Sequence, residues 1–279
     1  KKVYAKENAI WPFTVVGRPP QEDSQFGALI HEITGKAIEQ EIPGLKAVNA
    51  VDAAGVHPLL LAVGSERYTP YNLTKYPQEL LTIANHILGT GQMSLAKYIF
   101  ICDDENSPNV NDEKEYFTHF LERVNWQRDL HFQTKTTIDT LDYSGDGLNE
   151  GSKVVIAAAG EIKRTLSDSL PNINVPTGFS NPKLVSNGNL VLEGKGEMED
   201  LITSLENQNL DGIALITLVD DSAFVSKGFT NWLWITFTRS NPANDIYGLN
   251  YSTNNKHFSC SIPIIDARIK AHHAPILER

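Results

Sequence analysis

Residues 97–106 read KYIFICDDEN, and residues 213–221 read IALITLVDD. Each stretch is an apolar run that ends in a pair of aspartates, which is typical of a buried strand followed by a turn. A strand-like segment at 57–63 and a helical pattern at 77–88, PQELLTIANHIL, precede the first stretch. The segment LVLEGKGEMEDLITSL, at 190–205, precedes the second and has the same strand-then-helix order. The order strand, helix, strand therefore occurs twice along the chain.

The similarity continues after these runs. Three polar residues have identical spacing in the two halves, since Arg123, Asn125 and Asp129 match Arg239, Asn241 and Asp245. The segments that follow also correspond, because VVIAAAGEIK (154–163) aligns with IPIIDARIK (262–270). Self-similarity in a fixed order indicates tandem duplication. We therefore expect an α+β fold made of two related units with mixed sheets.

The unit boundaries follow from composition. The first unit is expected at 45–166, where a helix at 112–124 precedes two short strands at 129–133 and 136–141. A linker with three prolines and several Asn and Ser residues is expected at 167–188, and the second unit at 189–279. Before the first unit, residues 1–44 predict a strand at 10–17, the segment GRPPQED, and a helix at 24–39.

Composition excludes several classes of protein. The 279 residues carry 24 Lys and Arg against 34 Asp and Glu, a formal charge of −10, which disfavours nucleic acid as a partner. The longest apolar runs are far shorter than the roughly 18 residues of a membrane span. Cys102 and Cys260 lie in or beside strand-like runs, so we expect buried thiols in a reducing, cytoplasmic setting. Because no Met or signal segment begins the chain, we expect a piece of a longer protein.

The residues that could carry chemistry have structural explanations. No histidine pair has zinc-type spacing, and the adjacent His272 and His273 point to opposite faces on a strand. The loop 142–150 fails the calcium-loop spacing. The aspartate pairs that follow the two strands are expected to terminate them and cap helices, since both repeats keep them. Metal ligands are therefore not predicted.

Several segments together resemble one known family. TVVGRPPQED (14–23), GQMSLAKYIFICDDEN (91–106) and TIDTLDYS (137–144) resemble the C-terminal region of UbiD-type decarboxylases. So do WITFTRSNPANDIYG (234–248) and IPIIDARIKAHHAP (262–275). The matches touch most of the chain.

The resemblance implies a non-oxidative decarboxylase of aromatic, quinone-precursor-type acids that uses prenylated FMN with a divalent metal and potassium. The family's catalytic Arg and two Glu belong to a flavin domain that precedes this region, so residues 1–44 would be its end and the connecting helix. No catalytic, cofactor-binding or metal residue is assigned here, and the chain alone is expected to be inactive. Its expected partners are that flavin domain and further copies of itself.

The resemblance also suggests four residues for secondary roles. Thr136 and Ile138 lie in the connection that reaches toward the family's substrate pocket, although a plain edge strand explains them equally well. Arg18 and Glu22 are expected at the domain junction, although ordinary helix entry explains them equally well. The alternative hypothesis is a stand-alone module of two α+β repeats that binds a small molecule or regulates. That hypothesis predicts a polar pocket between the repeats, whereas the enzyme fragment predicts exposed apolar surface.

Overall fold

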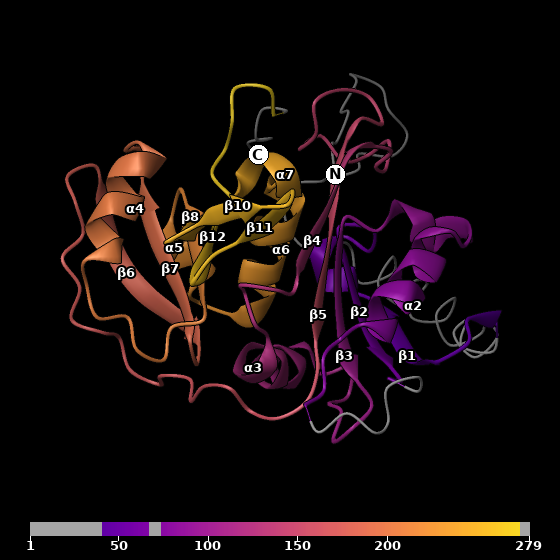
Figure 1. Ribbon diagram of the computed structural model, residues 1–279. Helices are drawn as coiled ribbons and strands as arrows, with labels where there is room; N and C mark the ends of the chain where they lie inside the picture. The colour runs from indigo at the N-terminus through magenta and orange to yellow at the C-terminus, as the bar shows by residue number, and fades with distance from the viewer. Residues whose placement is uncertain (1–40, 67–73, 274–279) are drawn as a thin grey trace.

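The computed structural model describes residues 41–66 and 74–273. The strand predicted at 10–17, the helix predicted at 24–39, and both Arg18 and Glu22 lie outside the described residues. Within the described ranges the chain forms two five-stranded sheets, with helices between and outside them (Figure 1). None of the helices in these ranges is long and apolar enough to cross a bilayer.

The first sheet has the strand order β1-β2-β3-β5-β4. Strands β2, β3 and β5 are parallel, while β1 and β4 are antiparallel edge strands. The apolar runs predicted from the sequence are the central strands, which are buried on both faces. The elements are β1 (Leu45–Ala50), η1 (Asp52–Ala54), β2 (Leu59–Gly64), α2 (Glu79–Leu88), η2 (Gly91–Leu95), β3 (Tyr98–Asp103), α3 (Glu113–Arg123), β4 (Leu130–Thr136) and β5 (Gly151–Ala158).

The second sheet repeats this topology. Its strand order is β6-β7-β8-β12-β9, with β7, β8 and β12 parallel and β6 and β9 antiparallel at the edges. The predicted duplication is therefore confirmed strand by strand. The elements are β6 (Phe179–Ser186), β7 (Asn189–Gly194), α4 (Met198–Glu206), β8 (Leu215–Val219), α5 (Ser222–Val225), α6 (Phe229–Arg239), α7 (Pro242–Asp245), β9 (Ile246–Leu249), β10 (Ser252–Asn254), β11 (His257–Ser259) and β12 (Ile262–Asp266).

The two units share one central core. Helices α3 and α6 lie between the sheets, whereas α2 and α4 cover the outer faces (Figure 1). The ring of Phe117 on α3 lies 5.0 Å from Trp232 and 6.0 Å from Phe237, both on α6. All three side chains are fully buried. Since these rings exclude water only when both units are present, neither unit completes its core alone.

Each unit also extends a connection onto the other. The β4–β5 connection of the first unit is the loop 137–150, and Asp146 in it accepts a hydrogen bond from Asn244 of α7 at 2.9 Å. The corresponding β9–β12 connection contains the β10–β11 hairpin, which packs on β4. Across that contact, Phe132 and Phe258 have ring centroids 5.8 Å apart. The interface is thus reciprocal: the corresponding connection of each unit contacts the other unit.

Two local predictions differ from the structure. Strand β6 lies inside the segment 167–188 that was expected to be a linker, so the second sheet begins at Phe179. Pro182 lies where the β6–β7 register shifts, a site at which an edge strand tolerates proline and its missing N–H. The strand predicted at 136–141 is also wrong, because β4 ends at Thr136 and a loop follows.

Candidate functional site

The paired aspartates stabilise the ends of their strands. Asp103 accepts a hydrogen bond from the backbone N–H of Gly160 at 2.9 Å, and Asp220 accepts one from Ile269 at the same distance. Asp221 caps α5 by accepting from Phe224 N at 2.8 Å. Both pairs therefore lie at strand ends, as the sequence predicted. The predicted helix capping is found only at Asp221, since Asp112 caps α3.

The Arg-x-Asn-x-x-x-Asp segments form the same turn twice. In the first unit the Asp129 carboxylate accepts from the backbone N–H of Asn125 at 2.7 Å. In the second unit Asp245 accepts from Asn241 N at 2.6 Å. Each aspartate is buried, which raises its pKa despite these hydrogen bonds. The segment is a structural connection in both copies.

Among the described residues, the thiols and histidines do not assemble a metal centre. Cys102 and Cys260 are buried free thiols, as predicted, and burial raises the pKa of each to about 12. His272 and His273 lie beside each other at the end of the described chain. In residues 41–66 and 74–273, no group of three or more His, Cys, Asp or Glu side chains could hold a metal ion.

The two suggested pocket-wall residues differ in exposure. Thr136 is the half-buried last residue of β4. Ile138 is fully buried, and a Cβ added to Gly151 would lie 2.9 Å from its Cδ1 atom. The Ile138 side chain therefore packs beneath its own loop. Their role in a substrate pocket stays a prediction.

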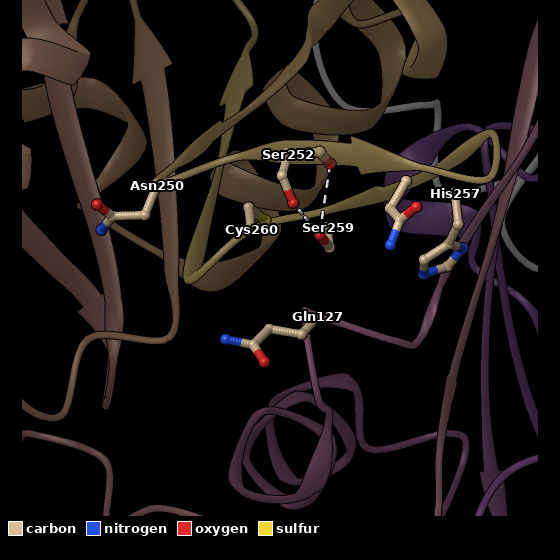
Figure 2. Close-up of a pocket in the computed structure, with 7 residues that line it drawn as sticks. Gln127, Asn250, Ser252, His257, Ser259 and Cys260 are labelled. Atoms are coloured by element: carbon tan, nitrogen blue, oxygen red, sulfur yellow. Dashed lines mark hydrogen bonds between the residues drawn. The ribbon is translucent and has the colours of Figure 1, made fainter.

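A cavity of about 410 Å³ lies between the two units. Gln127, in the turn before β4, faces the β10–β11 hairpin across this space, with Ser252 and Ser259 on the opposite side (Figure 2). The side chains that line it are Gln127, Asn250, Ser252, Asn254, His257, Ser259 and Cys260. The lining is polar and carries no carboxylate, lysine or arginine side chain.

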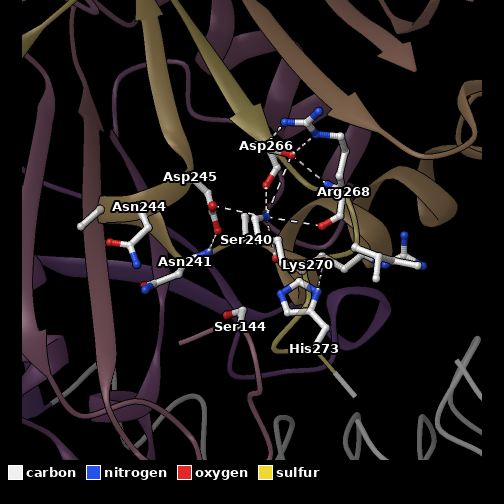
Figure 3. Close-up of polar contacts among 12 residues, drawn as sticks. Ser144, Ser240, Asn241, Asn244, Asp245, Asp266, Arg268, Lys270 and His273 are labelled. Carbon is white, nitrogen blue, oxygen red and sulfur yellow. Dashed lines mark hydrogen bonds and ion pairs between the residues drawn. The ribbon is translucent and has the colours of Figure 1, made fainter. Parts of the chain in front are cut away.

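A second polar assembly surrounds the ammonium group of Lys270, after β12 (Figure 3). Its Nζ atom lies 3.2 Å from Asp245 Oδ1, and it donates to the Asp266 carbonyl oxygen at 2.8 Å. Arg268 binds Asp266 through Nε and Nη2, at 3.0 and 2.7 Å. Burial raises the pKa of Asp266, but Arg268 and Lys270 outweigh burial, and the net pKa lies below its ordinary value. Two cations thus neutralise two carboxylates at the end of the second sheet.

Lys97 extends this assembly into the first unit. It precedes β3 and is fully buried, with Nζ 2.6 Å from Asp142 Oδ2 and 2.7 Å from Ser144 Oγ. Burial lowers the pKa of Lys97, and the adjacent Asp142 opposes that shift. Nearby, Tyr98 and Ser240 hydrogen-bond between the units at 2.7 Å. Sequence reasoning missed Lys97, because one lysine before an apolar run carries no local signal of burial.

The paired charges of this assembly hold loops of the chain in position. Its charges are mutually paired: Lys97 holds the loop 137–150 through Asp142, and Lys270 holds the end of α7 through Asp245. The hydrogen bond from Asn244 to Asp146 joins that loop to α7. His57 anchors the same loop through Asp139, with Nδ1 2.5 Å from Oδ2. The loop nevertheless exposes Leu141 and Leu148, which are 50% and 74% accessible. The assembly therefore holds in place a loop that exposes two leucines.

Comparison with known proteins places this fold in a family. Residues 24–158 match the family described as the 3-octaprenyl-4-hydroxybenzoate carboxy-lyase C-terminal domain, UbiD_C. Among curated relatives, an uncharacterised protein of Chlamydia trachomatis is 34% identical over 96% of this chain and 45% of its own length. A protein of Chlamydia pneumoniae that is named as a subunit of 4-hydroxybenzoate decarboxylase is 32% identical over 99% of this chain and 46% of its length. The chain thus spans less than half the length of these relatives.

Solved structures give a more distant match. The vanillic acid decarboxylase of Sedimentibacter hydroxybenzoicus, in its open form, is 16% identical and covers 52% of this chain and 28% of its own, with a TM-score of 0.38. The family match coincides with the segments at 91–106 and 137–144 that carried the resemblance in sequence. Residues 24–158 of this chain therefore carry the C-terminal domain of the UbiD family.

Proposed function

We propose that this chain is the C-terminal packing and oligomerisation part of a UbiD-like non-oxidative decarboxylase that acts on an aromatic acid of the quinone-precursor type. The observation that carries the proposal is the 32% identity, over 99% of this chain, to a protein named as part of a 4-hydroxybenzoate decarboxylase. The shared core of α3 and α6 supports a scaffolding role, because it makes the two units one rigid block.

In this proposal the flavin domain lies in the polypeptide before the first unit, and residues 1–44 connect the two. The exposed Leu141 and Leu148 support a docking surface on the loop 137–150. Thr136 would contribute to the pocket wall from the end of β4, and Ile138 would support the loop from beneath. Arg18 and Glu22 would lie at the junction.

Prenylated FMN, a divalent metal and potassium are assigned to the flavin domain. The described residues of this chain do not fit these groups, since they supply no metal-ligand cluster and the cavity has no Lys or Arg side chain for a flavin phosphate. The contribution of this chain is to pack against the domain that binds the cofactor.

Carbon dioxide release from 4-hydroxybenzoate tests the proposal. The full-length protein, produced together with a flavin prenyltransferase, is expected to release CO₂, whereas the 279-residue chain alone is expected to bind no flavin and release none. Full-length protein reconstituted with unmodified FMN is the control. Turnover by the chain alone, or none by the prenyl-FMN-loaded full-length protein with any hydroxybenzoate, would contradict the assignment.

A further inference from the structure

The cavity between the units has features that the packing role does not use. It is formed by both copies: Gln127 comes from the first unit, and the hairpin from Ser252 to Ser259 comes from the second. Its volume of about 410 Å³ falls within the range typical of small-molecule sites. The cavity exists only where the reciprocal connections meet.

Three ring nitrogens on and beside this cavity are buried without a hydrogen-bond partner. They are Nε2 of His257, which lines the cavity, Nε2 of His131, whose ring centroid lies 5.4 Å from that of His257, and Nε1 of Trp126. Trp126 is only 2% exposed, and its carbonyl oxygen accepts from Cys260 N at 3.2 Å. Buried polar groups ordinarily have partners, so the unpartnered Nε2 of His257 indicates a missing hydrogen bond at the cavity wall.

The side chains that line the cavity favour an uncharged ligand. Amide and hydroxyl side chains both donate and accept hydrogen bonds, and they dominate the lining. Arg128, which follows the lining residue Gln127, is occupied, because its Nη1 pairs with Asp129 at 3.0 Å and its guanidinium stacks over the ring of Tyr76. The lining side chains therefore offer an ionic ligand no carboxylate, lysine or arginine as a counter-ion for the hydration that it loses.

We infer that this cavity binds a small uncharged molecule rich in hydroxyl groups, of monosaccharide size, between the two copies of the repeat. Gln127 binds it from the first unit, and Ser252, His257 and Ser259 bind it from the hairpin. Binding would stabilise the contact between the hairpin and β4, because the ligand contacts both units. The inference does not depend on the decarboxylase assignment.

The test is a titration of the isotope-labelled 279-residue chain, followed by NMR at the His257 and Trp126 ring resonances. The probes are glucose, glucuronate and glucosamine, which share a ring and differ in charge. Glucose is expected to shift both resonances saturably in the millimolar range, and the two charged probes to bind at least about tenfold more weakly.

Two variants separate binding from general effects. Gln127→Leu is expected to weaken glucose binding at least about fivefold, because it removes an amide from the cavity wall. Gln133→Leu, on β4 but outside the lining, is the matched control and is expected to leave binding unchanged. Absence of saturation with glucose, equal or tighter binding of a charged probe, or unchanged binding in Gln127→Leu would each overturn the inference.

Discussion

The two copies of the repeat place the same framework around different side chains. Helices α3 and α6 have the same length, and each ends in an arginine. The residue seven positions before that arginine is Tyr116 in the first copy and Trp232 in the second. Tyr116 donates its hydroxyl proton to the central-strand carbonyl oxygens of Ala62 and Phe100, and Trp232 donates its indole N–H to Thr217 on β8. In both copies, an aromatic side chain on the helix donates a hydrogen bond to the sheet and so attaches the helix to it.

The copies differ where they meet. The residue directly before the second central strand is Lys97 in the first copy and Ala214 in the second. Lys97 is buried against Asp142 of its own loop, whereas the acidic cluster of the second copy is neutralised by Lys270 and Arg268. The comparison shows that duplication preserved the apolar layers, while the polar contacts became specific to each side of the interface.

The largest effect is expected from a substitution that disrupts the shared core. Phe237→Ala removes a fully buried ring that contacts Tyr98, Phe100, Phe117 and Trp232. We expect a loss of about 3–5 kcal/mol in the free energy of unfolding, measured by urea denaturation, with both sheets unfolding in one transition. Phe224→Ala, at a 44% exposed position, is the control, with an expected change below about 0.5 kcal/mol. Two separate transitions would show that the copies are independent.

A smaller effect is expected at the buried ion pair. Lys97→Met leaves Asp142 buried without its cation and should cost about 3 kcal/mol, near the lower end for such pairs because Ser144 still donates to Asp142. The double variant Lys97→Met/Asp142→Leu should recover most of this loss. Denaturation of these variants beside the exposed control Lys46→Met measures the coupling. If the double variant is as unstable as Lys97→Met, the pair does not account for the loss.

The smallest effect concerns pH at the reciprocal contact. Burial, together with His257 and Arg128, lowers the pKa of His131 from 6.5 to about 4. As pH falls from 7 toward 4, the unfolded chain therefore takes up a proton that the folded chain does not, and the free energy of unfolding decreases. His131→Gln should lessen this decrease, with His86→Gln as control. In His257→Gln, the His131 pKa measured by NMR should rise, and an unchanged value would contradict the contact across the units.

Much of the fold was predictable because its signals are local. The apolar runs at 57–63, 97–102 and 213–219 became central strands, and the helix predicted at 112–124 is α3. Repetition then predicted the second sheet from the first. Edge elements were harder to predict. Strand β6, which contains Asn181 and Pro182, and the short β10–β11 hairpin carry little apolar periodicity, since they are at most partly buried.

The candidate site was less predictable than the fold. The Arg-x-Asn-x-x-x-Asp turns were identified with their structural role, because a hydrogen bond to backbone four residues away leaves a fixed spacing. The aspartate pairs were identified as strand ends, but their backbone partners Gly160 and Ile269 lie far away in sequence and were not predicted. The cavity was expected only as a consequence of the two-repeat alternative. Its lining comes from residues 127 and 250–260, which become neighbours only when the units dock.

By itself, the sequence determined the order of strands and helices, the duplication and the family, because periodicity and repeated spacing are properties of neighbouring residues. The tertiary structure alone decided that the two units share a core, that Lys97 meets Asp142, and that the hairpin and Gln127 line one cavity. These contacts join residues far apart along the chain. Their existence depends on which apolar faces remain to be buried once each sheet has formed.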